Sequence, residues 1–347
     1  MDNGLLLQVE PSVPKGIARL AMQAPCLEDC REAAYYQIPA RSVLSRCNSP
    51  RVAFLWTINP YRGCAFGCVY CYARYTHEYF VANYRHRPRD PSYETIPATV
   101  MDFERRIYAK VGAAQVLAAE LQRRDVRGQQ IAVGTVTDPY QPAERRYRIT
   151  RSLLAVLARH QGLVLSLTTK SDLVTRDLDL LRRIAANSHL HVNITVTTLD
   201  HTLARRLEPR APRPDRRLAA VRRLVEGGIH TGVFVMPILP GLNDGAASLD
   251  ALVAAAAAAG ARYVATQPLC LRDATRARFY PWLRQEFPHL YARYRRLYAR
   301  DTDLPAGEAD RLRDLFDYLR RKHGLAGGRE SRLASLPHAP DQPALGL

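Results

Sequence analysis

The sequence is poor in lysine, in tryptophan and in long apolar runs. Only four of its 347 residues are lysines (positions 15, 110, 170 and 322), and two are tryptophans. No apolar run approaches the roughly 20 residues that span a bilayer. The first residues, MDNGLLLQVEPSVPKG, place Asp2 ahead of a short apolar run, where a signal peptide carries basic residues. We therefore expect a soluble, cytoplasmic protein with no membrane partner.

Acidic residues are also scarce relative to basic ones. The chain has 50 Lys+Arg and 33 Asp+Glu, which gives a formal charge of +17. Because lysine is so rare, this excess is carried by arginine. One interpretation is an electropositive surface for nucleic acid or another polyanion. The other is a coding bias that favours arginine and alanine. Charge alone therefore permits a nucleic-acid partner without requiring one.

Short β-like runs alternate with helical patterns along most of the chain. Six such units predict right-handed βαβ connections and a parallel sheet. Eight units close a full barrel, so six predict an α/β fold: a partial (β/α)6 TIM-like barrel with N- and C-terminal extensions. The predicted strands are Ala53–Ile58, Ile131–Val136, Leu163–Thr168, His191–Thr197, Thr231–Ile238 and Arg262–Gln267, with a further strand expected at Arg106–Lys110.

The composition predicts four segments. Residues 1–50 show no sustained period and form an N-terminal extension, and residues 51–282 form the partial barrel. Residues 283–325 form a C-terminal helical extension, with basic amphipathic helices at Leu283–Arg300 and Glu308–His323. Residues 326–347 are rich in Gly, Pro and Ser and are expected to be a disordered tail.

Three of the seven cysteines crowd into one short segment, Asn59–Tyr72, which reads NPYRGCAFGCVYCY. It follows the first strand, so it belongs to a βα loop at the face where such folds build their sites. The spacing of Cys64, Cys68 and Cys71 can bring three sulfurs to one centre. Iron–sulfur clusters are held by thiolates, and three ligands on four irons leave one iron open for chemistry. Glycines 63 and 67 allow the backbone to wrap tightly.

Two other interpretations of these cysteines remain. A noncatalytic, zinc-stabilised nucleic-acid-binding protein could use His77 as a fourth ligand, although zinc sites usually pair two knuckles and no second one exists here. Alternatively, the three thiols could bind nothing. The presence of three cysteines within eight positions disfavours this interpretation. The sequence assigns no role to Cys26, Cys30 or Cys47.

The CX3CX2C spacing, with an aromatic residue before the last cysteine, resembles the signature of the radical S-adenosylmethionine (SAM) superfamily. More narrowly, the chain resembles the spore photoproduct lyase-related group over about residues 36–323. The strings that carry this resemblance are NPYRGCAFGCVYCYAR (59–74), VGTVTDPYQPAERRYRITR (133–151), TTKSDLVTRDLDLL (168–181), LEPRAPRPDRRL (207–218) and PILPGLND (237–244).

The resemblance implies a 4Fe-4S cluster on Cys64, Cys68 and Cys71, with SAM bound to the open iron. Reductive cleavage of SAM then gives a 5′-deoxyadenosyl radical that abstracts hydrogen from a substrate, and a flavodoxin- or ferredoxin-type protein supplies the electron. A deep barrel mouth suits this chemistry because it excludes water. Whether SAM is consumed or regenerated is left open.

Four further residues are candidates for the SAM site, each with a plainer alternative. Tyr70 could pack beside the adenine or only shield the cluster. Asp138 could accept hydrogen bonds from the SAM ammonium or cap the turn before Pro139. Lys170 offers a compact charge for the SAM carboxylate, or is a solvated lysine at a strand end. Asn193 could contact SAM or satisfy backbone groups.

The chain also departs from the group's pattern. The DNA-repair lyase of that group returns a hydrogen atom from a cysteine near the end of its second strand, and Thr135–Asp138 contains none. Cys270, just after the last strand, is a candidate hydrogen donor, with a buried structural cysteine as the alternative. Arginines after the fourth strand could bind phosphates or form a solvated helix face: positions 205, 206, 210, 213, 216 and 217.

Overall fold

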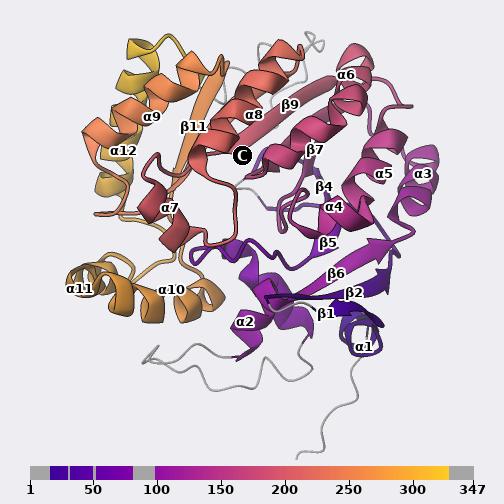
Figure 1. The fold of residues 1–347 in the computed structure, drawn as a ribbon, viewed down its shortest axis with the longest axis horizontal. Coiled ribbons are helices and arrows are strands. Elements are labelled where there is room, and N and C mark those ends of the chain that lie inside the picture. The colour runs from indigo at the N-terminus through magenta and orange to yellow at the C-terminus, as the bar shows by residue number, and fades with distance from the viewer. Residues whose placement is uncertain (1–15, 30–31, 50–51, 81–97, 328–347) are drawn as a thin grey trace, which may run out of the picture.

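The computed structural model describes residues 16–29, 32–49, 52–80 and 98–327. Two β-sheets organise this part of the chain (Figure 1). The larger sheet has eight strands in the order β12-β11-β10-β9-β8-β7-β4-β3, and the smaller has four in the order β1-β2-β6-β5. No helix within these ranges is both long and apolar enough to cross a bilayer.

All six strands predicted for the barrel are present in the larger sheet, parallel and in chain order. The second of them ends at Val133, earlier than predicted, because Gly134 turns the chain with φ +88°. An antiparallel strand, β3 (Leu44–Arg46), forms one edge, and β12 (Ala326–Gly327) the other. The six are β4 (Trp56–Ile58), β7 (Gln130–Val133), β8 (Val164–Thr169), β9 (His189–Thr195), β10 (His230–Ile238) and β11 (Tyr263–Pro268).

Alternation along the strands divides the sheet into an apolar and a polar face. Leu165, Leu167 and Val192 belong to the main hydrophobic core, while Ser166 and Asn193 lie on the opposite face. Helices follow one another around the outside of the sheet in Figure 1. They are α3 (Ala113–Arg123), α5 (Ile149–Leu157), α6 (Leu178–Asn187), α8 (Pro214–Glu226), α9 (Ala246–Ala258) and α12 (Ala306–Lys322).

The smaller sheet joins residues before position 40 to the strand expected at residues 106–110. Strand β2 (Ala34–Pro39) pairs in parallel with β6 (Arg106–Val111), and β5 (Tyr61–Arg62) pairs with β6 from the other side. The sequence showed no sustained period before residue 50, because these strands are short and are fixed by pairing with distant segments. The remaining elements here are α1 (Gly16–Met22), β1 (Cys26–Asp29) and α2 (Ala98–Arg105).

The helix predicted from Leu283 to Arg300 is wrong in its bounds. Helix α10 (Asp273–Glu286) begins earlier and contains Pro281, and a separate helix α11 (Pro288–Leu297) follows it. The break falls before Pro288, since proline disfavours helical backbone at the residue before it and suits the first position of a helix. Of the predicted tail, Ala326–Gly327 form β12, and the rest lies outside the described residues.

Candidate functional site

Residues 63–71, here called the cysteine loop, follow directly on β5. Both of its glycines are required by the backbone. Gly63 has φ +77°, and a Cβ there would lie 2.8 Å from the carbonyl oxygen of Phe103. Gly67 has φ +68°, and a Cβ there would lie 2.6 Å from Arg210 Nη2. The tight wrapping that the sequence predicted is therefore present.

Buried side chains from the segment after β7 hold the cysteine loop by its main chain. Gln141, which is fully buried, accepts a hydrogen bond from the Ala65 amide at 2.8 Å and donates to the Gly63 carbonyl at 3.1 Å. Thr137 Oγ1 donates to the same carbonyl at 2.6 Å. These bonds fix the loop independently of its cysteine side chains.

The three thiols of the loop lie in a low-dielectric environment close to one another. Cys64 and Cys68 are each 8% exposed and Cys71 is half-buried. Burial, together with the charges of Asp138 and Cys71, raises the pKa of Cys64 to about 12. Burial likewise raises the pKa of Cys68 and of Cys71, while nearby Lys170 lowers both. A ligand that binds these thiolates must therefore displace protons.

The three thiols are chemically suited to an iron–sulfur cluster, and the group that they bind stays a prediction. Within the described residues, no three His, Cys, Asp or Glu side chains meet as one metal ion would require. Thiolates are the ligands of four-iron clusters. Backbone amides of Phe66 and Asp138 also donate to the Cys64 sulfur, which lowers the pKa of that thiol. Amide donors of this kind are typical of cluster sites.

His77, the fourth ligand in the zinc alternative, packs on a different element. It lies in the 3-10 segment η1 (Tyr72–Phe80) and is 4% exposed. Its Nε2 lies 3.3 Å from the carbonyl oxygen of Arg106, and its ring meets that of Phe103 edge-on at 5.3 Å. Burial lowers the pKa of His77 to about 3. The ring is therefore a neutral part of the packing between η1, α2 and β6.

Asp138 joins the ends of two neighbouring strands. Its carboxylate accepts hydrogen bonds from Thr169 Oγ1 at 2.6 Å, from the Lys170 amide at 2.8 Å and from the Tyr140 amide at 2.9 Å. Burial raises its pKa, and these three bonds oppose the rise. The turn-forming role offered as an alternative is thus present. Contact with SAM stays a prediction for this residue.

Lys170 and Tyr70 face each other beside the cysteine loop. The Lys170 ammonium lies 5.7 Å from the centroid of the Tyr70 ring, and its side chain is 15% exposed. The Tyr70 ring is 6% exposed and packs in an apolar cluster with Cys64 and Cys68. The structure therefore places both candidates beside the thiols, and their contact with SAM stays a prediction.

Glu208, which the sequence analysis did not single out, lies at the centre of this group. It follows α7 (His201–Leu207), is 2% exposed, and accepts hydrogen bonds from the Tyr70 hydroxyl and from Thr197 Oγ1. It forms ion pairs with Arg217 and, at 3.9 Å, with Lys170. Burial alone would raise its pKa, but these partners lower it to about 2. Glu208 belongs to LEPRAPRPDRRL, one of the strings that carry the family resemblance, and that string was the signal in the sequence that could have pointed to it.

Asn193 lies deeper, on the polar face of the sheet. Its Nδ2 donates to Ser166 Oγ at 3.0 Å and to the Leu167 carbonyl at 3.2 Å, and its Oδ1 accepts a hydrogen bond from the Tyr263 hydroxyl. These bonds match the alternative in which a buried asparagine satisfies its neighbours. The predicted contact with SAM stays a prediction.

Cys270 lies shortly after the end of β11 and is half-buried. Burial and a hydrogen bond with Asp303 raise the pKa of its thiol. It is close enough to Tyr72 to raise the pKa of that hydroxyl, as does Cys71. The Tyr72 hydroxyl thus lies within electrostatic reach of both cysteines, and it donates a hydrogen bond to the Thr135 carbonyl. The hydrogen-donor role of Cys270 stays a prediction.

Two cysteines without an assigned role lie near the N-terminus. Cys30 lies outside the described residues, and Cys26 is exposed.

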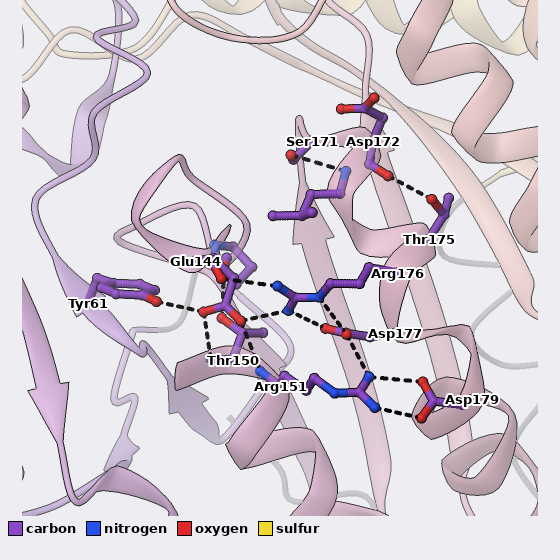
Figure 2. Close-up of polar contacts among 12 residues, drawn as sticks. Tyr61, Glu144, Thr150, Arg151, Ser171, Asp172, Thr175, Arg176, Asp177 and Asp179 are labelled. Atoms are coloured by element: carbon purple, nitrogen blue, oxygen red, sulfur yellow. Dashed lines mark hydrogen bonds and ion pairs between the residues drawn. The ribbon is translucent and has the colours of Figure 1, made fainter. Parts of the chain in front are cut away.

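A second, buried polar network links β5 to the segments that follow β7 and β8. Figure 2 shows Glu144 at its centre. The carboxylate of Glu144 accepts hydrogen bonds from the Tyr61 hydroxyl at 2.6 Å and from Arg176 Nη2 at 2.8 Å. Arg176 and Arg151 both pair with Asp177 at 2.8 Å. The network contributes to the stability of the fold and contains none of the predicted site residues.

Comparison with known proteins agrees with this geometry. The model of the Radical SAM superfamily matches residues 58–251, more than half of the chain. The chain belongs to the radical SAM superfamily. This confirms the resemblance found in the sequence. Members of the superfamily use a 4Fe-4S cluster and SAM, so membership indicates an enzyme that takes its electron from an external reductant.

Relatives of this radical SAM chain occur in bacteria and archaea. Uncharacterized protein Rv2578c of Mycobacterium tuberculosis is 37% identical over 294 residues, which cover 84% of this chain and 82% of the relative. Uncharacterized protein MJ0683 of Methanocaldococcus jannaschii is 30% identical over 193 residues, covering 54% of this chain and 62% of that protein.

Solved structures of spore photoproduct lyase share the fold. The complex with dinucleoside spore photoproduct has a TM-score of 0.58 at 17% identity and covers 84% of this chain and 80% of that one. A double mutant of the lyase with bound AdoMet and the same dinucleoside has a TM-score of 0.56 at 16% identity, with the same coverage. At these identities the likeness concerns the fold.

Proposed function

We propose that this radical SAM enzyme cleaves SAM reductively at a 4Fe-4S cluster held by Cys64, Cys68 and Cys71, and abstracts hydrogen from a substrate. The observation that carries the proposal is that the three thiols lie within electrostatic reach of one another, and that Cys68 and Cys71 also lie within reach of Lys170, which directly follows β8. Bound there, the cluster and SAM would supply a 5′-deoxyadenosyl radical. We also propose that residues 51–282 form a partial (β/α)6 barrel, flanked by extensions.

The chain's own residues bind, orient and exclude water. The cysteine loop is fixed by Thr137 and Gln141, so the thiols are directed before any ligand arrives. The Lys170 ammonium provides a positive charge where the SAM carboxylate would lie. An apolar cluster around the loop, with Phe66, Val69, Leu207, Leu269 and Phe279 among its buried members, keeps water from reactive intermediates.

Nucleic acid is the substrate class that we favour, in a reaction that resembles the repair lyase. Spore photoproduct lyase, which shares the fold, was solved in complex with dinucleoside spore photoproduct. Helices α10 and α11 together carry six arginines and two acidic residues, Asp273 and Glu286, so their net charge is positive and suits a polyanion. A flavodoxin- or ferredoxin-type protein would deliver the electron.

Anaerobic reconstitution tests the proposal. We expect about four irons per chain, a brown colour and 5′-deoxyadenosine that forms only when a reductant is present. Tight, stoichiometric zinc without SAM turnover would instead support the noncatalytic zinc protein. Comparing deoxyadenosine output with DNA, tRNA and fractions of cell extract then narrows the substrate, and stimulation by protein fractions alone would contradict a nucleic-acid substrate.

A further inference from the structure

Glu208 carries a charge in a place where charge is costly. An ion buried in a protein interior is strongly destabilising unless it is paired and hydrogen-bonded. Its two carboxylate oxygens face different partners. Oε2 faces Arg217, which is 1% exposed, and Oε1 faces the Tyr70 hydroxyl, Thr197 and the Lys170 ammonium. Arg217 therefore stabilises the carboxylate from one side, and the other oxygen is directed to the cysteine loop.

Arg217 is itself held firmly by the main chain. Its Nε donates to the Pro212 carbonyl at 2.7 Å, and its Nη1 donates to the Thr195 carbonyl at 3.2 Å. These bonds tie helix α8 to the end of β9. Because these bonds hold the Arg217 guanidinium in place, its ion pair with Glu208 also fixes the position of the carboxylate relative to the sheet.

Lys170 depends on Glu208 for its direction. In the described part of the chain, Glu208 is the one carboxylate within 4.0 Å of its ammonium group. A lysine side chain has considerable rotamer freedom, which a fixed partner reduces. The Tyr70 ring lies beside the same ammonium, with its centroid 5.7 Å away, and its hydroxyl donates to the carboxylate oxygen that faces Lys170. Ring and carboxylate together confine the charge beside the thiols.

We propose that Glu208 is a positioning residue of the cofactor site: its carboxylate orients the Lys170 ammonium and the Tyr70 ring to receive the carboxylate end of SAM. The inference rests on the proposed function, because it concerns the same site. Its rival is a purely structural role, in which the carboxylate only neutralises Arg217 inside the fold.

Glu208→Gln separates the charge from the hydrogen bonds. The amide oxygen can still accept from Tyr70 and Thr197, but the attraction to Lys170 is lost, and the amide nitrogen, which is a donor, replaces the oxygen that pairs with Arg217. With the reconstituted protein held without reductant, we expect isothermal titration calorimetry to show SAM binding weakened about tenfold, at unchanged iron content. If Glu208 instead repelled the SAM carboxylate, binding would tighten. Unchanged or tighter binding overturns the proposal.

A double-mutant cycle with Lys170→Ala shows through which residue Glu208 acts. If Glu208 works by orienting Lys170, the added effect of Glu208→Gln disappears in the Lys170→Ala background. If its role is structural, the two losses of SAM affinity add, and additivity refutes the proposal. Failure of the wild-type protein to bind SAM would instead refute the proposed function.

Two further variants guard against simple misfolding. Glu144→Gln is a matched control, because Glu144 is also fully buried and arginine-paired but lies in the network of Figure 2, with no contact to Lys170 or Tyr70. We expect it to lower the melting temperature and leave SAM affinity unchanged. Glu208→Gln combined with Arg217→Met removes both buried charges, so it restores stability while SAM binding stays weak. Restored binding in that variant overturns the positioning role.

Discussion

The Tyr263 ring lies across Gly232, and its hydroxyl thereby reaches the Asn193 side chain two strands away. Gly232 is the register partner of Tyr263 on one side and of Asn193 on the other. A Cβ at Gly232 would overlap the atoms of the ring. The polar face of the sheet is therefore closed by a layer that spans β9, β10 and β11. Barrel interiors are commonly filled by such layers.

Gly232→Ala should destabilise the protein by about 2 kcal/mol, because the new methyl group overpacks against the Tyr263 ring. Urea unfolding of purified protein measures the change. Gly307→Ala is the control, since that glycine lies in α12 with no atom within 4 Å of an added Cβ, and alanine there should stabilise the helix by about 0.5 kcal/mol. Equal effects at both positions would contradict the close packing.

Cys68→Ala should abolish both cluster retention and SAM cleavage, because it removes one of the three proposed iron ligands. Iron content and 5′-deoxyadenosine after anaerobic reconstitution are the measurements. Cys47→Ala is the matched control, as this cysteine is outside the cysteine loop and should leave both quantities unchanged. Intact turnover in Cys68→Ala would refute the ligand assignment.

Lys170→Ala should weaken SAM binding about tenfold or more, since it removes a partly buried positive charge from the site. Iron content should not change. Lys322→Ala serves as control, because this lysine pairs with Asp250 at the end of α12, away from the cysteine loop. Calorimetry measures the SAM affinity of each variant. If wild type and Lys170→Ala bind SAM equally well, Lys170 does not have this role.

His77 should make the stability of the protein fall in acid. Its pKa is lowered from 6.5 to about 3 by burial, so the unfolded chain binds a proton more readily than the folded one between these values. The contribution is therefore present above pH 6.5 and lost as the pH falls toward 3. Chemical unfolding at several pH values measures the slope, and His77→Gln should flatten it. A slope that the substitution leaves intact assigns the acid sensitivity to other groups.

Periodicity and glycine placement were enough to predict the parallel sheet and the cysteine loop. The strands at residues 164–169, 189–195 and 230–238 are long and apolar enough to be read locally. Gly63 and Gly67 have the positive φ that the tight loop implied. These features depend only on residues that are close together in the sequence, so a single sequence is enough to predict them.

Long-range pairing could not be predicted in the same way. The pairing of β2 with β6 joins Tyr36 to Tyr108, and no local pattern marks either residue as a partner. Glu208 was missed for the same reason, because its importance lies in contacts with Tyr70 and Lys170 that the fold alone creates. The string that contains it pointed to a family, and its chemistry became visible only in three dimensions.

The arginines between positions 205 and 217 alter how the formal charge of +17 should be understood. Arg217 is paired with Glu208 and Arg206 with Glu286, while the guanidinium of Arg210 lies against the cysteine loop, donating to the Ala65 and Glu104 carbonyls. Arg213 and Arg216 each face a carboxylate. An incoming polyanion would have to displace acceptors that the chain already provides. The number of arginines in the sequence therefore overstates how strongly residues 205–217 attract phosphate groups.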